Sequence, residues 1–75
     1  MSDYTTDYID STRYTSEVGS EVTCTLVHTK YGCEVRVIQR FQIIFEVRAP
    51  MVFGTIGAGQ AYLNAIKRGD ARPLP

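Results

Sequence analysis

The feature that most constrains the fold is a strict alternation of side-chain character over residues 33–48. Seven of the eight odd positions are apolar, whereas six of the eight even positions are polar. A period of two sends successive side chains to opposite faces, so this segment is predicted to be a long strand with one buried face.

Residues 21–29 alternate in the same way and are predicted to form the partner strand of a hairpin. Tyr31-Gly32 is the predicted two-residue turn, because glycine readily supplies a positive φ. This turn pairs Leu26 with Val37 and Val22 with Phe41, so that apolar residues meet on one face of the hairpin.

An earlier strand is expected over residues 12–18, with Gly19-Ser20-Glu21 as a three-residue turn that sets Tyr14 opposite Leu26. Residues 1–11 are open to three interpretations: a helical turn, an added edge strand or a mobile arm. Their content of Thr and Tyr favours extended chain.

Ala49-Pro50 is predicted to end the long strand, because proline lacks an N–H group and restricts the residue before it. A helix is predicted over Ala58–Arg68, with Thr55 as N-cap and Gly69 just beyond the end. Residues 70–75 are expected to be a short extended tail. The helix spacing also sets five residues on one face: Val52, Ile56, Gly59, Leu63 and Ile66.

With 75 residues, the chain has room for one domain, residues 1–75. The predicted fold class is α+β: a three-stranded antiparallel meander, containing the long hairpin 21–48, with one C-terminal helix packed on its apolar face.

Composition excludes several classes of protein. Hydrophobic residues make up 44% of the chain and the formal net charge is zero, which argues against a disordered chain and against a strongly basic nucleic-acid binder. No apolar run is long enough for a membrane span, and the polar N-terminus is unlike a signal peptide. Two cysteines are too few for a disulfide framework, so we expect free thiols and a cytoplasmic location.

Charge is unevenly placed along the chain. Residues 1–21 hold five acidic side chains and one basic side chain, whereas residues 22–75 hold seven basic and three acidic side chains. The two regions are expected either to attract each other or to face different partners.

Cys24, His28 and Cys33 all fall on the apolar face of the predicted hairpin. Residues four apart on a strand are separated by about 13 Å, so Cys24 and His28 cannot share a metal ion. No obvious orienting acid accompanies His28 and Cys33, and the register sets Cys24 opposite Gln39, too far from Cys33 for a disulfide. We therefore expect core residues and neither a catalytic nor a metal site.

Residues 54–59 read Gly-Thr-Ile-Gly-Ala-Gly and open the predicted helix, where phosphate-binding loops sit. The glycine spacing differs from that of the dinucleotide fingerprint, and no Gly-Lys-Ser/Thr follows. We expect no cofactor and interpret the glycines as positions of close helix packing.

Two charged surfaces are candidates for partner binding. Arg36, Arg40 and Arg48 share the even face of the predicted long strand, which is either solvated, protein-binding or nucleic-acid-binding. At the N-terminus, acidic residues alternate with Tyr4 and Tyr8 in an arm that is either solvated or fits a basic groove. The acidic candidates are Asp3, Asp7 and Asp10.

The second half of the predicted long strand has no assigned neighbour, because residues 21–29 reach only as far as Phe41. An unpaired apolar edge favours a homodimer through Ile43, Phe45 and Val47. The alternatives are pairing with residues 1–11, an edge occupied by a partner protein, or a bend of the strand back on itself. No glycine or proline signals such a bend.

Together these features predict a small non-enzymatic binding protein with a protein partner, such as an inhibitor or adaptor of the kind that phages encode. The alternative is a small nucleic-acid-binding module that uses the arginine-bearing strand, which zero net charge disfavours.

Overall fold

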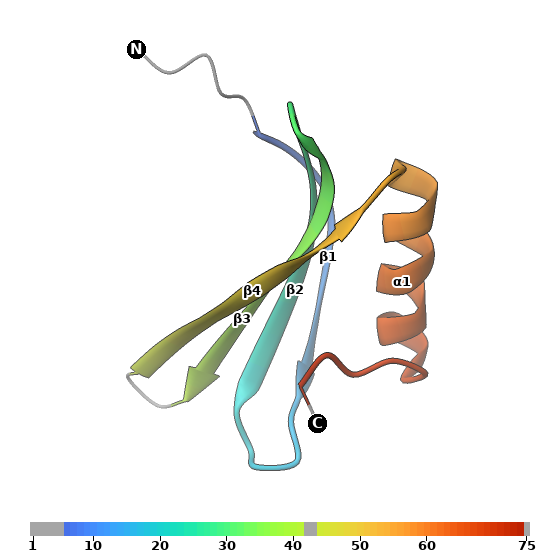
Figure 1. The fold of residues 1–75 in the computed structure, drawn as a ribbon. Coiled ribbons are helices and arrows are strands. Elements are labelled where there is room, and N and C mark those ends of the chain that lie inside the picture. The colour runs from blue at the N-terminus through green and yellow to red at the C-terminus, as the bar shows by residue number, and fades with distance from the viewer. Residues whose placement is uncertain (1–5, 42–43, 75) are drawn as a thin grey trace.

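The computed structural model describes residues 6–41 and 44–74, and the side chains of residues 7–40 and 50–74. Its elements, in chain order, are β1 (Thr6–Thr15), β2 (Glu21–Thr29), β3 (Gly32–Phe41), β4 (Ile44–Phe53) and α1 (Ile56–Arg68). The strands form one antiparallel sheet in the order β1-β2-β3-β4, and α1 lies against one face of it (Figure 1). The predicted α+β meander with a C-terminal helix is confirmed, with four strands in place of three.

The expected single strand over residues 33–48 is wrong, because the chain reverses after β3. Phe41 pairs with Ile44 and Arg40 with Phe45, so β4 returns along β3. Apolar alternation is the same in one long strand and in two strands joined by a short turn, so it does not distinguish between them.

Pro50 does not end a strand but lies inside β4. Val37 pairs with Arg48 and Val35 pairs with Met51, so Ala49 and Pro50 together lie opposite Arg36. This is a β-bulge, with two residues facing one. A bulge in an outer strand tolerates a residue without an N–H group, which is why β4 continues to Phe53.

The predicted β2–β3 hairpin forms, but its register differs by two residues. Thr29 pairs with Gly32, so Lys30-Tyr31 is the turn, and Leu26 lies opposite Val35 instead of Val37. The Thr29 hydroxyl accepts a hydrogen bond from the Tyr31 N–H (3.1 Å) and donates one to the Gly32 carbonyl (3.3 Å), which closes the turn at this place. A shift of two leaves every side chain on its predicted face.

The first strand also starts and ends earlier than predicted, so residues 6–11 belong to an edge strand. Tyr14 pairs with Val22 and not with Leu26. The reason lies in the turn that follows: the Ser16 N–H donates to the Ser20 carbonyl (2.8 Å), and the two buried hydroxyls lie 2.6 Å apart. A bulge at Ile9 interrupts the pairing of β1 with β2.

The helix is confirmed and begins two residues earlier than predicted. The Thr55 hydroxyl caps it by accepting a hydrogen bond from the Ala58 N–H (3.1 Å), and Gly69 ends it with a φ of 84°. Its buried face holds Gly59, Leu63 and Ile66. Val52 and Ile56, also predicted for this face, are exposed, because Val52 belongs to β4 and Ile56 to the first turn.

The hydrophobic core lies between α1 and the sheet. The strands contribute six of its buried residues and the helix two: Val22, Cys24, Leu26, Cys33, Val35, Val37, Leu63 and Ile66. Beyond the helix, the tail turns back and packs Ala71 and Leu74 against this core. Over residues 6–41 and 44–74, no helix has the length and apolar character that a bilayer-spanning helix needs.

Candidate functional site

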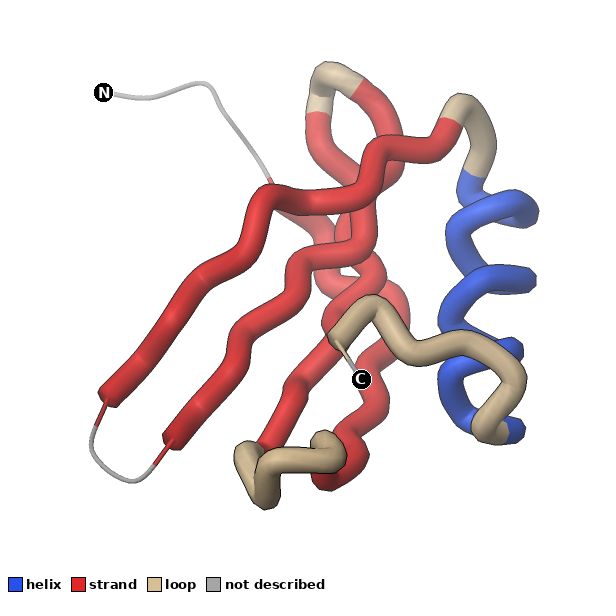
Figure 2. The backbone as a smooth tube through the Cα atoms, turned by 60° about the horizontal axis from the view of Figure 1, so that its bottom comes forward, coloured by secondary structure: helices blue, strands red, loops and turns tan. Residues whose placement is uncertain are grey.

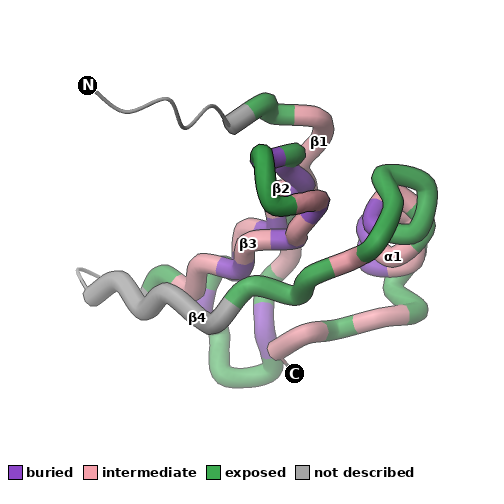
Figure 3. Tube along the Cα trace, turned by 45° about the horizontal axis from the view of Figure 1, so that its top comes forward, coloured by how far each residue is buried: buried purple, intermediate pink, exposed green. Residues whose placement is uncertain are grey.

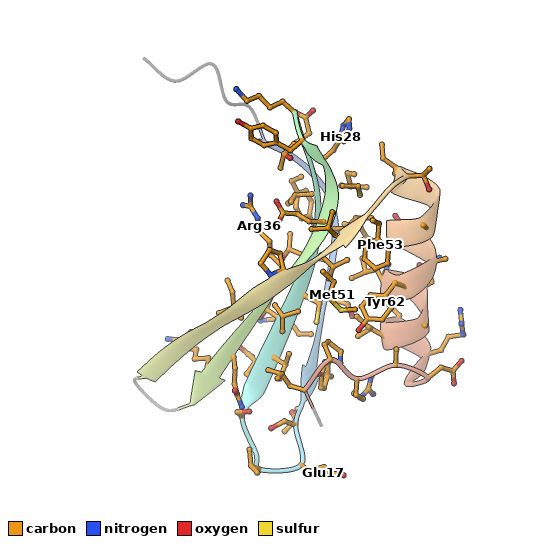
Figure 4. The ribbon with its side chains drawn as sticks, in the orientation of Figure 1. Glu17, His28, Arg36, Met51, Phe53 and Tyr62 are labelled. Atoms are coloured by element: carbon orange, nitrogen blue, oxygen red, sulfur yellow. The ribbon has the colours of Figure 1, made fainter. Side chains whose placement is uncertain are left out.

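The helix covers only one face of the sheet, and the opposite face is here called the open face. Alternate residues of a strand point to opposite faces, and directly paired residues share a face. Figure 4 shows His28, Phe53 and Tyr62 on the α1 side and Arg36 on the other. From this register the described members of the open face are Tyr8, Ser11, Arg13, Thr15, Glu21, Thr23, Thr25, Val27, Thr29, Glu34, Arg36, Ile38, Arg40 and Val52.

A row of three apolar residues and one glutamate crosses the open face near the turn between β2 and β3. Tyr8 pairs with Val27, Val27 with Glu34, and Glu34 with Val52, so one residue comes from each strand. Tyr8 and Val52 at the two ends of the row are 66% and 73% exposed, while Val27 between them is 4% exposed. The row therefore presents an aromatic side chain at one edge of the sheet and an aliphatic side chain at the other, separated by the covered Val27 and by Glu34.

The remaining rows of the open face carry hydroxyl groups and arginines. The Ser11 and Thr25 hydroxyls lie 3.3 Å apart, and Thr25 pairs with Arg36. Arg36 lies 3.5 Å from an oxygen of the partly buried Glu34, and Arg13 of β1 lies 3.8 Å from an oxygen of Glu21 in β2. Both contacts are long and both arginines reach solvent. Such ion pairs contribute little to stability, so these charges mainly set the polarity of the face.

The three arginines that the sequence places on one strand belong to two strands. Arg36 and Arg40 lie on the open face of β3, whereas the backbone of Arg48 belongs to β4 and pairs with Val37. The predicted position of Arg48 on the same strand as the other two is therefore wrong, because the chain reverses after Phe41. The side chain of Arg48 lies outside the described part.

The acidic residues of the predicted N-terminal arm do not form one surface. Asp3 lies outside the described residues, and Asp7 is exposed on β1 opposite His28. Asp10 binds Lys67 and also accepts hydrogen bonds from Gln60 Nε2 (3.1 Å) and the Ser11 N–H (2.8 Å). These contacts, led by that with Lys67, lower the pKa of Asp10 from 3.8 to about 2. Asp10 thus connects β1 to α1.

On the α1 side, the observed register brings together three residue types that occur in catalytic sites. Asp7 pairs with His28, and His28 pairs with Cys33. Sequence reasoning missed this row because it set the hairpin register two residues away and left residues 1–11 unassigned. The signal available in the sequence was the content of Thr, Tyr and Asp in residues 1–11, which is compatible with a strand.

The position of Cys33 makes it a core residue in this row. It is 2% exposed, and a Cβ added at Gly59 would lie 3.1 Å from its sulfur. Burial raises the pKa of Cys33, and it raises that of Cys24 to about 11. Thiols with raised pKa values are poor nucleophiles. Within the described ranges, no group of three or more His, Cys, Asp or Glu residues fits a metal ion.

The residues predicted for a dimer interface lie in or beside β4. Ile43 falls outside the described residues, and the side chains of Phe45 and Val47 are not among those described. The backbones of Phe45 and Val47 pair with Arg40 and Ile38 of the same chain. The unpaired segment that motivated the dimer therefore has a partner strand, and the dimer itself stays a prediction.

No family model, curated protein or solved structure matches this chain. The open face is thus identified from the geometry of the chain alone. Sequence reasoning found Arg36 and Arg40 on it but missed Tyr8 and Val52, which join the face only when β1 and β4 pair with the central strands.

Proposed function

We propose that the protein is a non-enzymatic binding module whose open face contacts another protein, in the manner of an inhibitor or adaptor. The observation that carries this proposal is the exposure of two apolar side chains, Tyr8 and Val52, at opposite edges of the face that α1 leaves uncovered. Figure 3 shows the same asymmetry, with the helix on one side of the strands only.

The composition of the open face supports a protein partner. Interfaces are enriched in aromatic and arginine side chains, and a few such residues near the centre dominate the affinity. Tyr8 supplies an exposed ring, and Arg13 and Arg36 supply guanidinium groups in the rows beside it. Glu21 and Glu34 balance part of the positive charge of these two arginines. The face is therefore closer to the mixed polar rim of a protein interface than to a strongly basic surface.

A nucleic-acid-binding module is a second candidate, favoured by one observation. Tyr8 shares the open face with Arg13 and Arg36, so one face carries both an exposed ring and positive charge. Single-stranded nucleic acid binds such platforms by stacking and phosphate contacts. Titration of a labelled single strand at several salt concentrations tests this: several phosphate contacts give a steep salt dependence, whereas absent or salt-independent binding removes the candidate.

Site-specific photo-crosslinking tests the protein-binding proposal. A photoreactive phenylalanine analogue replaces Tyr8 in one variant and exposed Ala61 on α1 in a control variant, each expressed in the source cells. We expect a discrete adduct from position 8 and none from position 61. Adducts of equal yield from both positions, or none from position 8, would contradict use of the open face.

The captured partner then allows a quantitative test. Tyr8→Ala is expected to weaken binding at least roughly tenfold, because truncated aromatic anchors typically cost about 2 kcal/mol or more. The thermal midpoint should change little, because this side chain is largely exposed. An unchanged affinity would exclude Tyr8 as an anchor.

Two further properties are proposed with the function. We propose a homodimer through β4, and light scattering at high micromolar concentration distinguishes dimer from monomer. We also propose a cytoplasmic location, which the two free thiols of Cys24 and Cys33 support. Fractionation of the source cells tests the location.

A further inference from the structure

The chain after α1 returns to the strands (Figure 2), where Ala71 and Leu74 pack against the core. We call Ala71–Leu74 the strap. The Tyr14 hydroxyl donates a hydrogen bond to the Leu74 carbonyl (2.6 Å) and accepts one from the Leu74 N–H (3.0 Å). The Arg72 guanidinium lies 4.3 Å from the centre of the Tyr14 ring. One tyrosine thus holds the strap at two points.

The strap differs from the strands in how it is attached. The Asp70 and Ala71 N–H groups still donate to the Ala65 carbonyl, at 2.8 and 3.2 Å, as an extension of the helix end. Farther along, the hydrogen bonds of the described strap residues come from two side chains, those of Tyr14 and Arg72. The strands, in contrast, are held by continuous backbone ladders. Few contacts therefore need to break for the strap to leave.

Cys24 lies one row of the core away from the place where the strap is held. Tyr14, which holds the strap, pairs with Val22, and Cys24 is two residues farther along β2, opposite Thr12. The Cys24 side chain is fully buried, which raises its pKa, and the positive charge of the strap residue Arg72 lowers that pKa in part. The strap residues Ala71 and Leu74 pack against the cluster that contains Cys24.

We propose that the strap opens and closes independently of the rest of the fold and covers Cys24 when closed. Opening then presents an apolar surface at this end of the molecule while the sheet and α1 stay intact. Local openings of this kind require less free energy than global unfolding and involve segments with few contacts.

Two buried cysteines make this proposal testable within one molecule. Cys33 lies beneath Gly59 of α1, and Cys24 pairs with Val37, four residues farther along β3. That separation is about 13 Å along the strand. Cys24 therefore reports on the strap, whereas Cys33 reports on separation of the helix from the sheet.

The experiment is thiol labelling of the full chain at increasing low denaturant, with each cysteine quantified by mass spectrometry after digestion. We expect Cys24 to react faster than Cys33 at a rate that is nearly independent of denaturant, because local opening exposes little surface. Labelling of Cys33 should follow global unfolding. Equal rates with the same denaturant dependence would overturn the proposal, since the strap would then open only with the whole fold.

A point variant separates the strap from general stability. Tyr14→Phe removes both hydrogen bonds to Leu74 and should raise labelling of Cys24 roughly tenfold, still with little dependence on denaturant. Labelling of Cys33 rises as well, because the closed fold loses the same stability, but it keeps the steep denaturant dependence of global unfolding. Thr55→Ala is the control, because it destabilises the start of α1 without touching the strap, and it should raise labelling of Cys33 while leaving that of Cys24 unchanged at low denaturant. No increase at Cys24 in Tyr14→Phe, or an equal increase at both cysteines in Thr55→Ala, would overturn the proposal. If Tyr14→Phe does not fold, the denaturant dependence of the unmodified protein decides.

Discussion

Asp10, in the outer strand β1, is ion-paired with Lys67 in the last turn of α1, across 57 residues of sequence. The same carboxylate also accepts a hydrogen bond from the side-chain amide of Gln60, which likewise belongs to α1. One ion pair thus joins the acidic N-terminal region of the chain to its basic C-terminal region.

Asp10 should make stability depend on pH in the acidic range. Its pKa is lowered from 3.8 to about 2 in the folded chain, so the ionised form stabilises the fold above the unfolded-state value. That contribution is lost as the pH falls from about 4 towards 2. The thermal midpoint of the native protein should therefore drop more over this window than that of Asp10→Asn. Parallel pH profiles of the two proteins would contradict this role.

Gly59→Ala should destabilise the fold although alanine favours helix. An added Cβ would lie 2.6 Å from the Leu26 Cδ1 atom and 3.1 Å from the Cys33 sulfur, and Leu26 is fully buried. Overpacking of this kind costs about 1–3 kcal/mol. Gly57→Ala is the control, because nothing lies within 4 Å of its Cβ position, and it should stabilise by about 0.5–1 kcal/mol. Chemical denaturation measures both, and the same sign for the two variants would refute the packing explanation.

Ser20→Ala should be costly because Ser20 is the centre of a buried polar cluster. Its hydroxyl lies 2.6 Å from that of Ser16 and accepts a hydrogen bond from Gln39 Nε2 (2.8 Å). Removing it takes one hydrogen bond from the buried Ser16 hydroxyl, which still accepts from the residue 20 N–H, and one from the half-buried Gln39 amide, at a cost of about 1–3 kcal/mol. Ser11→Ala, at a half-buried site with one longer contact, should cost less. Urea denaturation that ranks Ser11→Ala as the more damaging change would contradict this assignment.

Thr55→Ala should destabilise the start of α1 by about 1 kcal/mol, because it removes the hydroxyl that caps the Ala58 N–H. Thr55→Ser retains that oxygen and should stay close to the native stability. Thermal unfolding followed by circular dichroism measures both. Equal losses in the two variants would show that the methyl group, and not the cap, matters at this position.

The sequence predicts which face of a strand is buried more securely than it predicts which residues pair across neighbouring strands. Alternation identifies which side of β2 and β3 is buried, and it remains correct when the register moves by two residues. The register depends on the Thr29 hydroxyl, which bonds locally to Tyr31 and Gly32 and selects the turn. Such a side-chain choice between neighbouring turns is not visible in a hydrophobic pattern.

The open face was only partly predictable for a related reason. Arg36 and Arg40 are visible as polar positions of one strand. The row that runs from Tyr8 to Val52 needs all four strands in register, including the reversal after Phe41 and the bulge at Ile9. Tyr8 and Val52 lie in segments that the sequence pattern assigned either to an arm or to the start of the helix. Their shared position is a product of tertiary pairing.

The two bulges lie at nearly the same level, one in each outer strand. Ile9 interrupts β1 beside Leu26. Ala49-Pro50 interrupts β4 opposite Arg36, which directly follows Val35, the partner of Leu26 in β3. Free strand edges are templates on which further copies of a chain assemble into fibrils, and bulges and prolines hinder that growth. A small protein built largely of strands is therefore protected at both borders of its sheet against polymerising with itself.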